Sequence, residues 1–231
     1  MENKLIIKTA LDVLKTEIIG IKKISKIIDN NFLNIIKKLS KTRGKVIFTG
    51  VGKSAHIAKK ISSTMSSTGT PSQFCHSTEM SHGDLGIISK NDIVIILSNS
   101  GNSVELEGVI NFCKKNKIYT IGVSSVKNSN LINSTNMSLI IPAADEACAI
   151  GLAPTTSTSM TLIIGDIICV SLMRVKKFST KDYRNIHPGG SLGESLLQVK
   201  KIMHTGKKIP LIDENASMRD AILEITRKSF G

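Results

Sequence analysis

A cluster of hydroxyl side chains follows a short apolar segment in the middle of the chain. The apolar residues Ile93–Leu97 end at Ser98-Asn99-Ser100-Gly101, and Ser103 follows two residues later. An apolar run of this length that ends at a turn is typical of a buried strand in a parallel sheet. Ligands bind at the carboxyl ends of such strands, where hydroxyls, backbone N–H groups and a helix N-terminus suit a phosphate. The segment alone also fits a turn without a ligand, because the same residues dominate turns.

A second candidate anion site is the glycine-rich segment Gly50-Val51-Gly52-Lys53-Ser54. It follows the predicted strand Lys45–Thr49 and precedes a helical pattern. It lacks the four residues that a P-loop has between its first glycine and Gly-Lys-Ser/Thr, and Ala55 replaces the third glycine of the dinucleotide fingerprint. The segment therefore gives little support to a nucleotide site and predicts a contact between Ser54 and a small anion.

Ionisable side chains recur close to the other predicted strand ends. They are His76, His82, Asp84, Glu105, Asp145, Glu146 and His187. Each has a simpler explanation: Glu105 can complement a helix dipole, the two carboxylates at 145–146 can be solvated loop charges, and His187 can shape a turn. As a set at one sheet edge they suit acid–base chemistry, in which carboxylates and imidazoles transfer protons.

The surrounding pattern predicts the elements that position these residues. Strand-like segments alternate with helical ones, which predicts an α/β fold with a parallel sheet and helices on both faces. The predicted strands are 45–49, 72–76, 92–97, 118–123 and 138–141, and the predicted helices are 53–66, 104–115, 155–175 and 192–199. Helical spacing over 5–39, interrupted at Asp29–Asn31, predicts two N-terminal helices. The long first helix packs either on its own core or on a partner subunit, and the apolar helix 155–175 is expected to be buried.

Composition narrows the function classes. The formal net charge is +13 and aromatic residues make up 3%. The lysines are spread along the chain and no nucleic-acid-reading motif is present, so we expect attraction for anionic metabolites rather than nucleic-acid binding. Four separated cysteines argue against a disulfide framework and a thiolate zinc site. No apolar run is expected to span a bilayer and no signal-peptide core is visible, which predicts a cytoplasmic protein without a membrane partner.

Six segments together carry a resemblance to a known family. They are GVGKSAHIAKK, STGTPSQF, EMSHGDLG, ILSNSGNS, DEACAIGLAPTTSTS and HPGGSLG. In order and spacing they resemble the sugar isomerase (SIS) domain of arabinose-5-phosphate isomerases, and IMHTGKKIPLI is similar to the linker into the CBS domains that usually follow. The resemblance implies a SIS domain over 1–203 and a linker with the truncated start of a CBS domain over 204–231. It also implies a three-layer αβα sandwich with a five-stranded parallel sheet, assembled as a homotetramer.

The resemblance also implies an activity. The family interconverts D-ribulose 5-phosphate and D-arabinose 5-phosphate through a cis-enediol, which supplies Kdo and lipopolysaccharide biosynthesis. The residues that match the family's catalytic positions are Lys53, Glu105, Glu146 and His187. The expected substrate contacts are Gly69, Thr70 and His82, which match family positions, with Ser54, Ser98, Ser100 and Ser103 from the two loops. His76 matches a histidine that the family associates with zinc.

Roles for the catalytic residues follow from the chemistry of isomerisation. A base must take the C–H proton and return it, and we expect Glu146 to do so. Lys53 would stabilise the enediolate oxygen, His187 would assist ring opening or transfer the proton between oxygens, and Glu105 would position hydroxyls or share acid–base duty. No cofactor is expected to be required. Zinc at His76 would be inhibitory or adventitious, because zinc sites draw on three or four ligands.

Two other functions stay open at this point. One is an isomerase for a different sugar phosphate. The other is a non-catalytic sensor that binds a phosphosugar; such a protein would be expected to lose acid–base residues, whereas Glu105, Glu146 and His187 are all present here.

Overall fold

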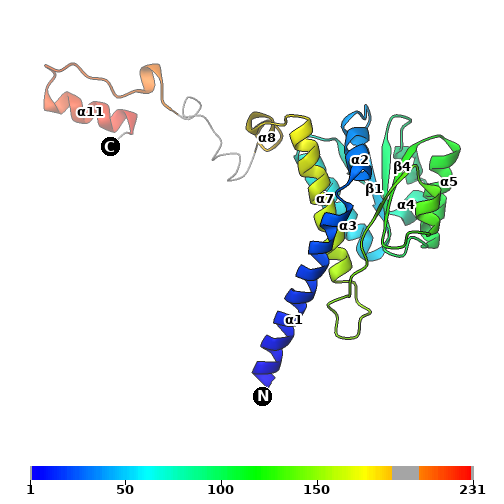
Figure 1. The fold of residues 1–231 in the computed structure, drawn as a ribbon. Coiled ribbons are helices and arrows are strands. Elements are labelled where there is room, and N and C mark those ends of the chain that lie inside the picture. Colours follow the sequence, from blue (N-terminus) through cyan, green and yellow to red (C-terminus); the bar gives the residue numbers. More distant parts are fainter. Residues whose placement is uncertain (1, 189–202, 230–231) are drawn as a thin grey trace. The chain divides into compact units, whose positions relative to one another are not determined.

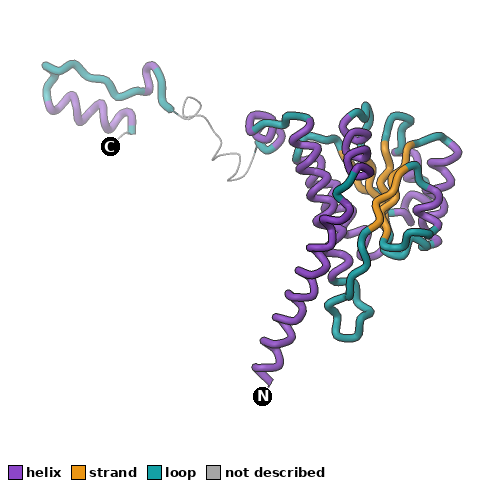
Figure 2. Tube along the Cα trace, in the orientation of Figure 1, coloured by secondary structure: helices purple, strands orange, loops and turns teal. Residues whose placement is uncertain are grey.

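Five parallel strands form the sheet of the first of two units. The computed structural model describes residues 2–188 and 203–229, within the units Met1–Tyr183 and Arg184–Gly231. The strands, orange in Figure 2, are β1 (Val46–Gly50), β2 (Ser72–Phe74), β3 (Ile93–Leu97), β4 (Tyr119–Ser124) and β5 (Met137–Ile140). They pair in the order β2-β1-β3-β4-β5, and every neighbouring pair is parallel. The prediction of a five-stranded parallel sheet is confirmed.

Helices cover both faces of the sheet and give three layers (Figure 1). Val46 and Phe48 of β1 pack into one core and Ile47 packs into the other, as the two-residue period of a strand requires. On the first face lie α2 (Asn30–Ser40), α3 (Gly52–Ser67) and α7 (Thr156–Val175). On the second lie α4 (Ser77–Ser81), η2 (Asp84–Ile87), η3 (Val104–Leu106), α5 (Glu107–Lys115) and α6 (Asn130–Ser134). The predicted αβα sandwich is therefore also confirmed.

The N-terminal region forms the two predicted helices. Helix α1 (Glu2–Lys23) passes through a short 3-10 turn, η1 (Ile24–Ile27), into α2. The side chain of Asp29 accepts a hydrogen bond from the N–H of Phe32 (3.0 Å) and so caps the start of α2. Within α1 only Gly20 is buried, and the first half of the helix extends away from the sheet (Figure 1). Its apolar side chains are exposed, among them Leu5, Ile6, Ile7, Leu11 and Leu14.

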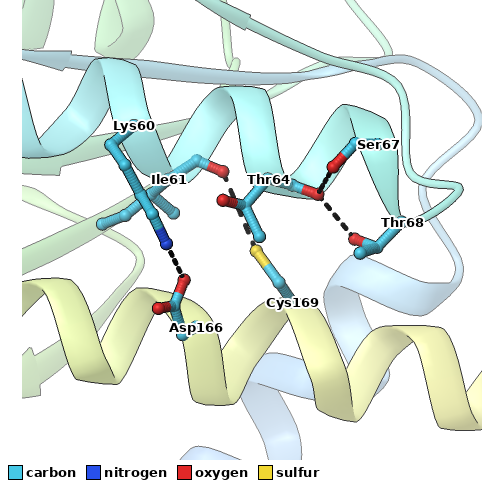
Figure 3. Close-up of polar contacts among 7 residues, drawn as sticks. All are labelled: Lys60, Ile61, Thr64, Ser67, Thr68, Asp166 and Cys169. Carbon is cyan, nitrogen blue, oxygen red and sulfur yellow. Dashed lines mark hydrogen bonds and ion pairs between the residues drawn. The ribbon is translucent and has the colours of Figure 1, made fainter. Parts of the chain in front are cut away.

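Helix α7 packs along α3, as Figure 3 shows. Lys60 of α3 forms an ion pair with Asp166 of α7 (2.5 Å), and the Cys169 thiol approaches the carbonyl oxygen of Ile61 (3.8 Å). By length and composition α7 could cross a membrane, so the expectation that no apolar segment has that length was wrong. The core helix of a soluble protein meets the same criteria, and seven residues of α7 are buried in this unit.

The described part of the second unit contains short helices and no buried residue. Helix α8 (Thr180–Ile186) crosses from the first unit into the second, and η4 (Gly206–Lys208) and α11 (Met218–Lys228) follow. The hydroxyl of Ser217 caps α11 by accepting a hydrogen bond from the N–H of Asp220 (3.2 Å). The predicted helix 192–199 lies outside the described residues, and the predicted boundary between residues 203 and 204 stays a prediction.

The contact between α3 and α7 predicts a sensitive position at Gly165. A Cβ atom there would lie 2.3 Å from Cγ1 and Cδ1 of Ile61. We expect Gly165→Ala to lower the free energy of unfolding by about 1–3 kcal/mol, because overpacking forces side chains and backbone to shift. The measurement is chemical denaturation, with Gly86→Ala as the control, since a Cβ there would meet nothing within 4 Å. Equal stability of the two variants would contradict this account of the interface.

Candidate active site

The order of the strands creates a crevice between β1 and β3. The chain runs from β1 to its neighbour β2 on one side, while β3 lies on the other side of β1. In open parallel sheets ligands bind at the carboxyl ends of the strands, where the strand order reverses in this way. A pocket of about 290 Å³ lies at this place. Its lining includes five of the predicted residues, namely Lys53, Ser54, Ser98, Ser100 and Ser103.

The loop after β1 brings the N-terminus of α3 to the pocket. Gly50 ends the strand so close to β3 that a Cβ atom would lie 2.9 Å from the carbonyl oxygen of Leu97. Helix α3 begins at Gly52, and its N-cap residue Val51 provides no side-chain hydrogen bond. The first N–H groups of a helix lack intrahelical partners and carry partial positive charge, so an anion can bind there. The exposed Lys53 side chain adds a full positive charge to this side of the pocket.

The loop after β3 is held in shape by its own hydroxyls. Ser98 Oγ accepts a hydrogen bond from the N–H of Gly101 (3.0 Å) and lies 3.2 Å from Ser103 Oγ. Gly101 has a φ of +68°, and a Cβ atom there would lie 2.1 Å from Ser129 Oγ. A side chain at this position would therefore displace the loop. This arrangement holds hydroxyl donors at fixed positions around the pocket, which suits a phosphate group.

Glu146 is bound to the N-terminus of α7, on the third side of the pocket. Its Oε2 accepts hydrogen bonds from the N–H (2.7 Å) and hydroxyl (3.0 Å) of Thr155 and from the N–H of Ser157 (3.3 Å). Burial, the largest single influence, raises the pKa of Glu146, but hydrogen bonds involving Ser157 and Thr155 together hold this pKa below its ordinary value. Glu146 is therefore a carboxylate at neutral pH, bonded to Ser157, which lines the pocket. The same bonds give it a structural role as the cap of α7.

Of the four predicted catalytic residues only Lys53 lines this pocket; Glu146 reaches it through its bond to Ser157, and Glu105 and His187 are not in the lining. Glu105 is exposed in η3, two residues after the lining residue Ser103. His187 belongs to the second unit, so its contribution to this site stays a prediction.

The two predicted histidines of the segment after β2 lie at the ends of α4. Nδ1 of His76 accepts a hydrogen bond from the N–H of Thr78 (3.3 Å) at the start of the helix, and His82 is the C-cap residue. The hydroxyl of Ser77 donates to the carbonyl oxygen of Gly50 (3.2 Å), so α4 begins beside the end of β1. Both histidines therefore lie near the carboxyl edge of the sheet, where the pocket is, but they do not line the pocket.

The described residues around His76 do not complete a zinc site on their own. Among residues 2–188 and 203–229, no three His, Cys, Asp or Glu side chains form a group that could hold a metal ion. The adjacent Cys75 donates to Asp84 (3.5 Å), and burial together with this hydrogen bond raises the pKa of the thiol to about 11. Cys75 is therefore a protonated thiol at neutral pH, whereas zinc binds the thiolate.

Gly69 and Thr70 lie at the opposite edge of the sheet. They precede β2, and the carbonyl oxygen of the next residue, Pro71, accepts a hydrogen bond from the N–H of Val46 at the start of β1 (2.9 Å). A Cβ atom on Gly69 would lie 2.2 Å from the ring of Phe178, and the buried Thr70 hydroxyl is 2.9 Å from Nζ of Lys176. Within the first unit these two residues are not brought to the pocket. Their substrate contacts stay a prediction.

The start of α7 supplies pocket residues that were not predicted as substrate contacts from the sequence. They are Pro154, Ser157, Thr158 and Thr161. A usable signal is present in the sequence, because Ser157 and Thr161 are four residues apart in a helix that begins after a proline. Residues at this spacing share one helix face, so both hydroxyls can reach the same ligand.

Comparisons with known proteins agree with this architecture. The SIS domain family matches residues 38–171. The chain is 45% identical to arabinose 5-phosphate isomerase KdsD of Yersinia pestis over 220 residues, which are 95% of this chain and 67% of that protein. It is 43% identical to the KdsD protein of Escherichia coli K12 over 205 residues, 88% of this chain and 62% of that one. The chain thus spans about two thirds of the length of these relatives.

A solved structure has the same fold. The protein c3406 of E. coli CFT073, solved in complex with arabinose 5-phosphate, superposes with a TM-score of 0.76 at 40% identity. The match covers 81% of this chain and 100% of that one. The strand order, the pocket between β1 and β3 and the match over residues 38–171 lead to one conclusion: the chain belongs to the SIS domain family.

Proposed function

We propose that the protein is an aldose–ketose isomerase that interconverts D-ribulose 5-phosphate and D-arabinose 5-phosphate through a cis-enediol. One observation carries the proposal: a single pocket joins Lys53 and the serine loop to the N-terminus of α7, where Glu146 is bound. The identity of 41–45% to relatives named arabinose 5-phosphate isomerase supports the choice of substrate.

The phosphate binds among the serine hydroxyls and the N-terminus of α3. Ser54, Ser100 and Ser103 donate hydrogen bonds to its oxygens, and the first N–H groups of α3 add theirs. Such a contact holds the reacting carbons in a fixed position relative to Glu146. Fixing reactants in this way removes much of the entropic part of the barrier.

The reaction transfers two protons and leaves the atom count unchanged. Glu146 takes a proton from C1 of the ketose, the C–H electrons form the C1–C2 double bond, and the carbonyl electrons move to O2. Lys53 stabilises the resulting negative charge on O2. Glu146 then returns a proton to C2 while the O1 proton moves to O2, which leaves an aldehyde at C1. His187 assists ring opening or this transfer between oxygens, and Glu105 positions the sugar hydroxyls.

We further propose the setting in which this reaction takes place. The protein acts in the cytoplasm and supplies Kdo and lipopolysaccharide biosynthesis, in keeping with the KdsD relatives. It assembles as a homotetramer and needs neither nucleic acid nor a membrane, and residues 204–231 begin a CBS domain. The exposed apolar side chains of α1, such as Leu5, Ile6 and Ile7, support assembly, since contiguous apolar surfaces are typical of interfaces.

The activity is tested by following D-ribulose 5-phosphate in deuterated water by NMR. We expect D-arabinose 5-phosphate with deuterium at C2, because the proton on the base exchanges with solvent before it returns. Product without deuterium would argue against an exchanging base, and binding without product would indicate a sensor or an isomerase for another sugar.

The role of Glu146 predicts the behaviour of Glu146→Gln. The amide oxygen can still accept hydrogen bonds from Thr155 and Ser157, so the start of α7 should remain folded. We expect substrate affinity to change less than about threefold, while kcat falls at least about a thousandfold because the base is lost. Isothermal titration and a coupled assay measure the two quantities. Retained turnover would show that another group is the base.

The reaction should need no metal ion. Proton transfer by Glu146 and stabilisation of the enediolate by Lys53 account for the chemistry, so we expect a chelator to leave kcat unchanged. Added zinc should inhibit, and His76→Asn should reduce this inhibition, since asparagine retains an acceptor that can cap α4. Loss of activity on chelation, restored by one metal ion alone, would contradict the proposal.

A further inference from the structure

A basic hollow lies at the edge of the sheet opposite the candidate active site. Its volume is about 380 Å³, and it is formed by the end of α2 and by the loops that enter β1, β3 and β4. Five cationic side chains line this amino-edge hollow: Lys38, Lys41, Arg43, Lys90 and Lys117. Three of them lie close together at and just after the end of α2, and the fold adds Lys90 and Lys117 from two distant loops.

The hollow contains little compensating negative charge. Its lining includes one carboxylate, Asp92, which is 4% exposed. Both of its oxygens accept backbone hydrogen bonds, from the N–H of Lys45 and from the N–H of Ser89 (2.8 Å each). In the part of the chain that the structure describes, none of the five cations forms an ion pair; the pairs found there are Lys60–Asp166 and Lys228–Glu224.

Helix dipoles explain only part of this charge. Lys38 in the last turn of α2 and Lys41 at its C-cap complement the carbonyl end of the helix. Arg43, Lys90 and Lys117 lie in three different loops, outside the helices. Lys117 also has a φ of +56°, at a position after α5 where glycine is usual.

We propose that the amino-edge hollow binds a polyphosphate chain, that is, at least two linked phosphate groups. Its volume falls within the range of small-molecule pockets, about 300–1,000 Å³, and a single phosphate would fill only a small part of it. Arg43 can form paired hydrogen bonds to phosphate oxygens, while the lysines act as point charges. Inorganic polyphosphate and nucleoside polyphosphates both carry this group.

A small ligand fits the hollow better than a nucleic acid does. Single strands bind along grooves in which successive bases stack on aromatic side chains. The aromatic residue in the lining is Tyr119, and Nζ of Lys38 lies 3.9 Å from its ring centroid. Recognition in the hollow therefore depends on charge at a concave site.

The test is isothermal titration of the full chain with tripolyphosphate at low salt. The hollow variant combines Arg43→Gln, Lys90→Gln and Lys117→Gln. A matched control combines Lys22→Gln, Lys26→Gln and Lys59→Gln, which removes the same charge from exposed sites outside the hollow. We expect the dissociation constant to rise about a hundredfold in the hollow variant and less than about threefold in the control. Unchanged isomerase rates and thermal unfolding in both variants establish that they are folded.

Titrations with further ligands show which kind of polyphosphate binds and which results would overturn the proposal. ATP binding about tenfold more tightly than tripolyphosphate would indicate a nucleoside polyphosphate, and equal affinity would indicate the inorganic chain; both support the proposal. Equal losses in the two variants would overturn it in favour of diffuse charge. It would also be overturned if D-ribulose 5-phosphate displaced tripolyphosphate, or if an oligonucleotide bound the hollow with an affinity that grew with its length.

Discussion

The parallel direction of all five strands is the constraint on which the other features depend. Each helix that returns the chain must start near the carboxyl edge of the sheet and end near the amino edge. Helix N-termini carry partial positive charge and C-termini partial negative charge. The first unit is therefore polarised before any side chain is considered. The N-termini of α3 and α7 both reach the pocket between β1 and β3.

Helix α7 connects this polarity to the stability of the unit. Its start is held by Glu146, and its middle packs against α3 at Gly165 and Ile61. Near its start it also contacts α1, where a Cβ atom on Gly20 would lie 2.4 Å from Thr156 Cγ2. The position of the carboxylate thus depends on the packing of a whole helix. A substitution far from the pocket that shifts α7 would also shift Glu146.

Features that depend on residues close together in the sequence, such as strands and turns, could be predicted. Features that depend on how distant segments are arranged in the fold could not. The strands, the serine loop and the glycine-rich loop follow from apolar runs that end at turn residues. The motif around Gly69 and Thr70 does not reveal that these two residues precede a strand rather than follow one. Their position at the amino edge of the sheet is therefore visible only in the fold. Lys90 and Lys117 are likewise distant in the sequence from the basic residues at the end of α2, and only the fold brings them together at one hollow.

The two edges of the sheet would bind anions by different means, and the dipoles explain why. At the carboxyl edge, helix N-termini already favour negative charge, so neutral hydroxyls and one lysine, Lys53, suffice for a sugar phosphate. At the amino edge, the carbonyl ends of α2 and α5 repel an anion. A site there must overcome this repulsion with side-chain charge, and the hollow has five cations against one carboxylate. An anion site at the amino edge therefore needs an excess of cationic side chains, whereas a site at the carboxyl edge does not.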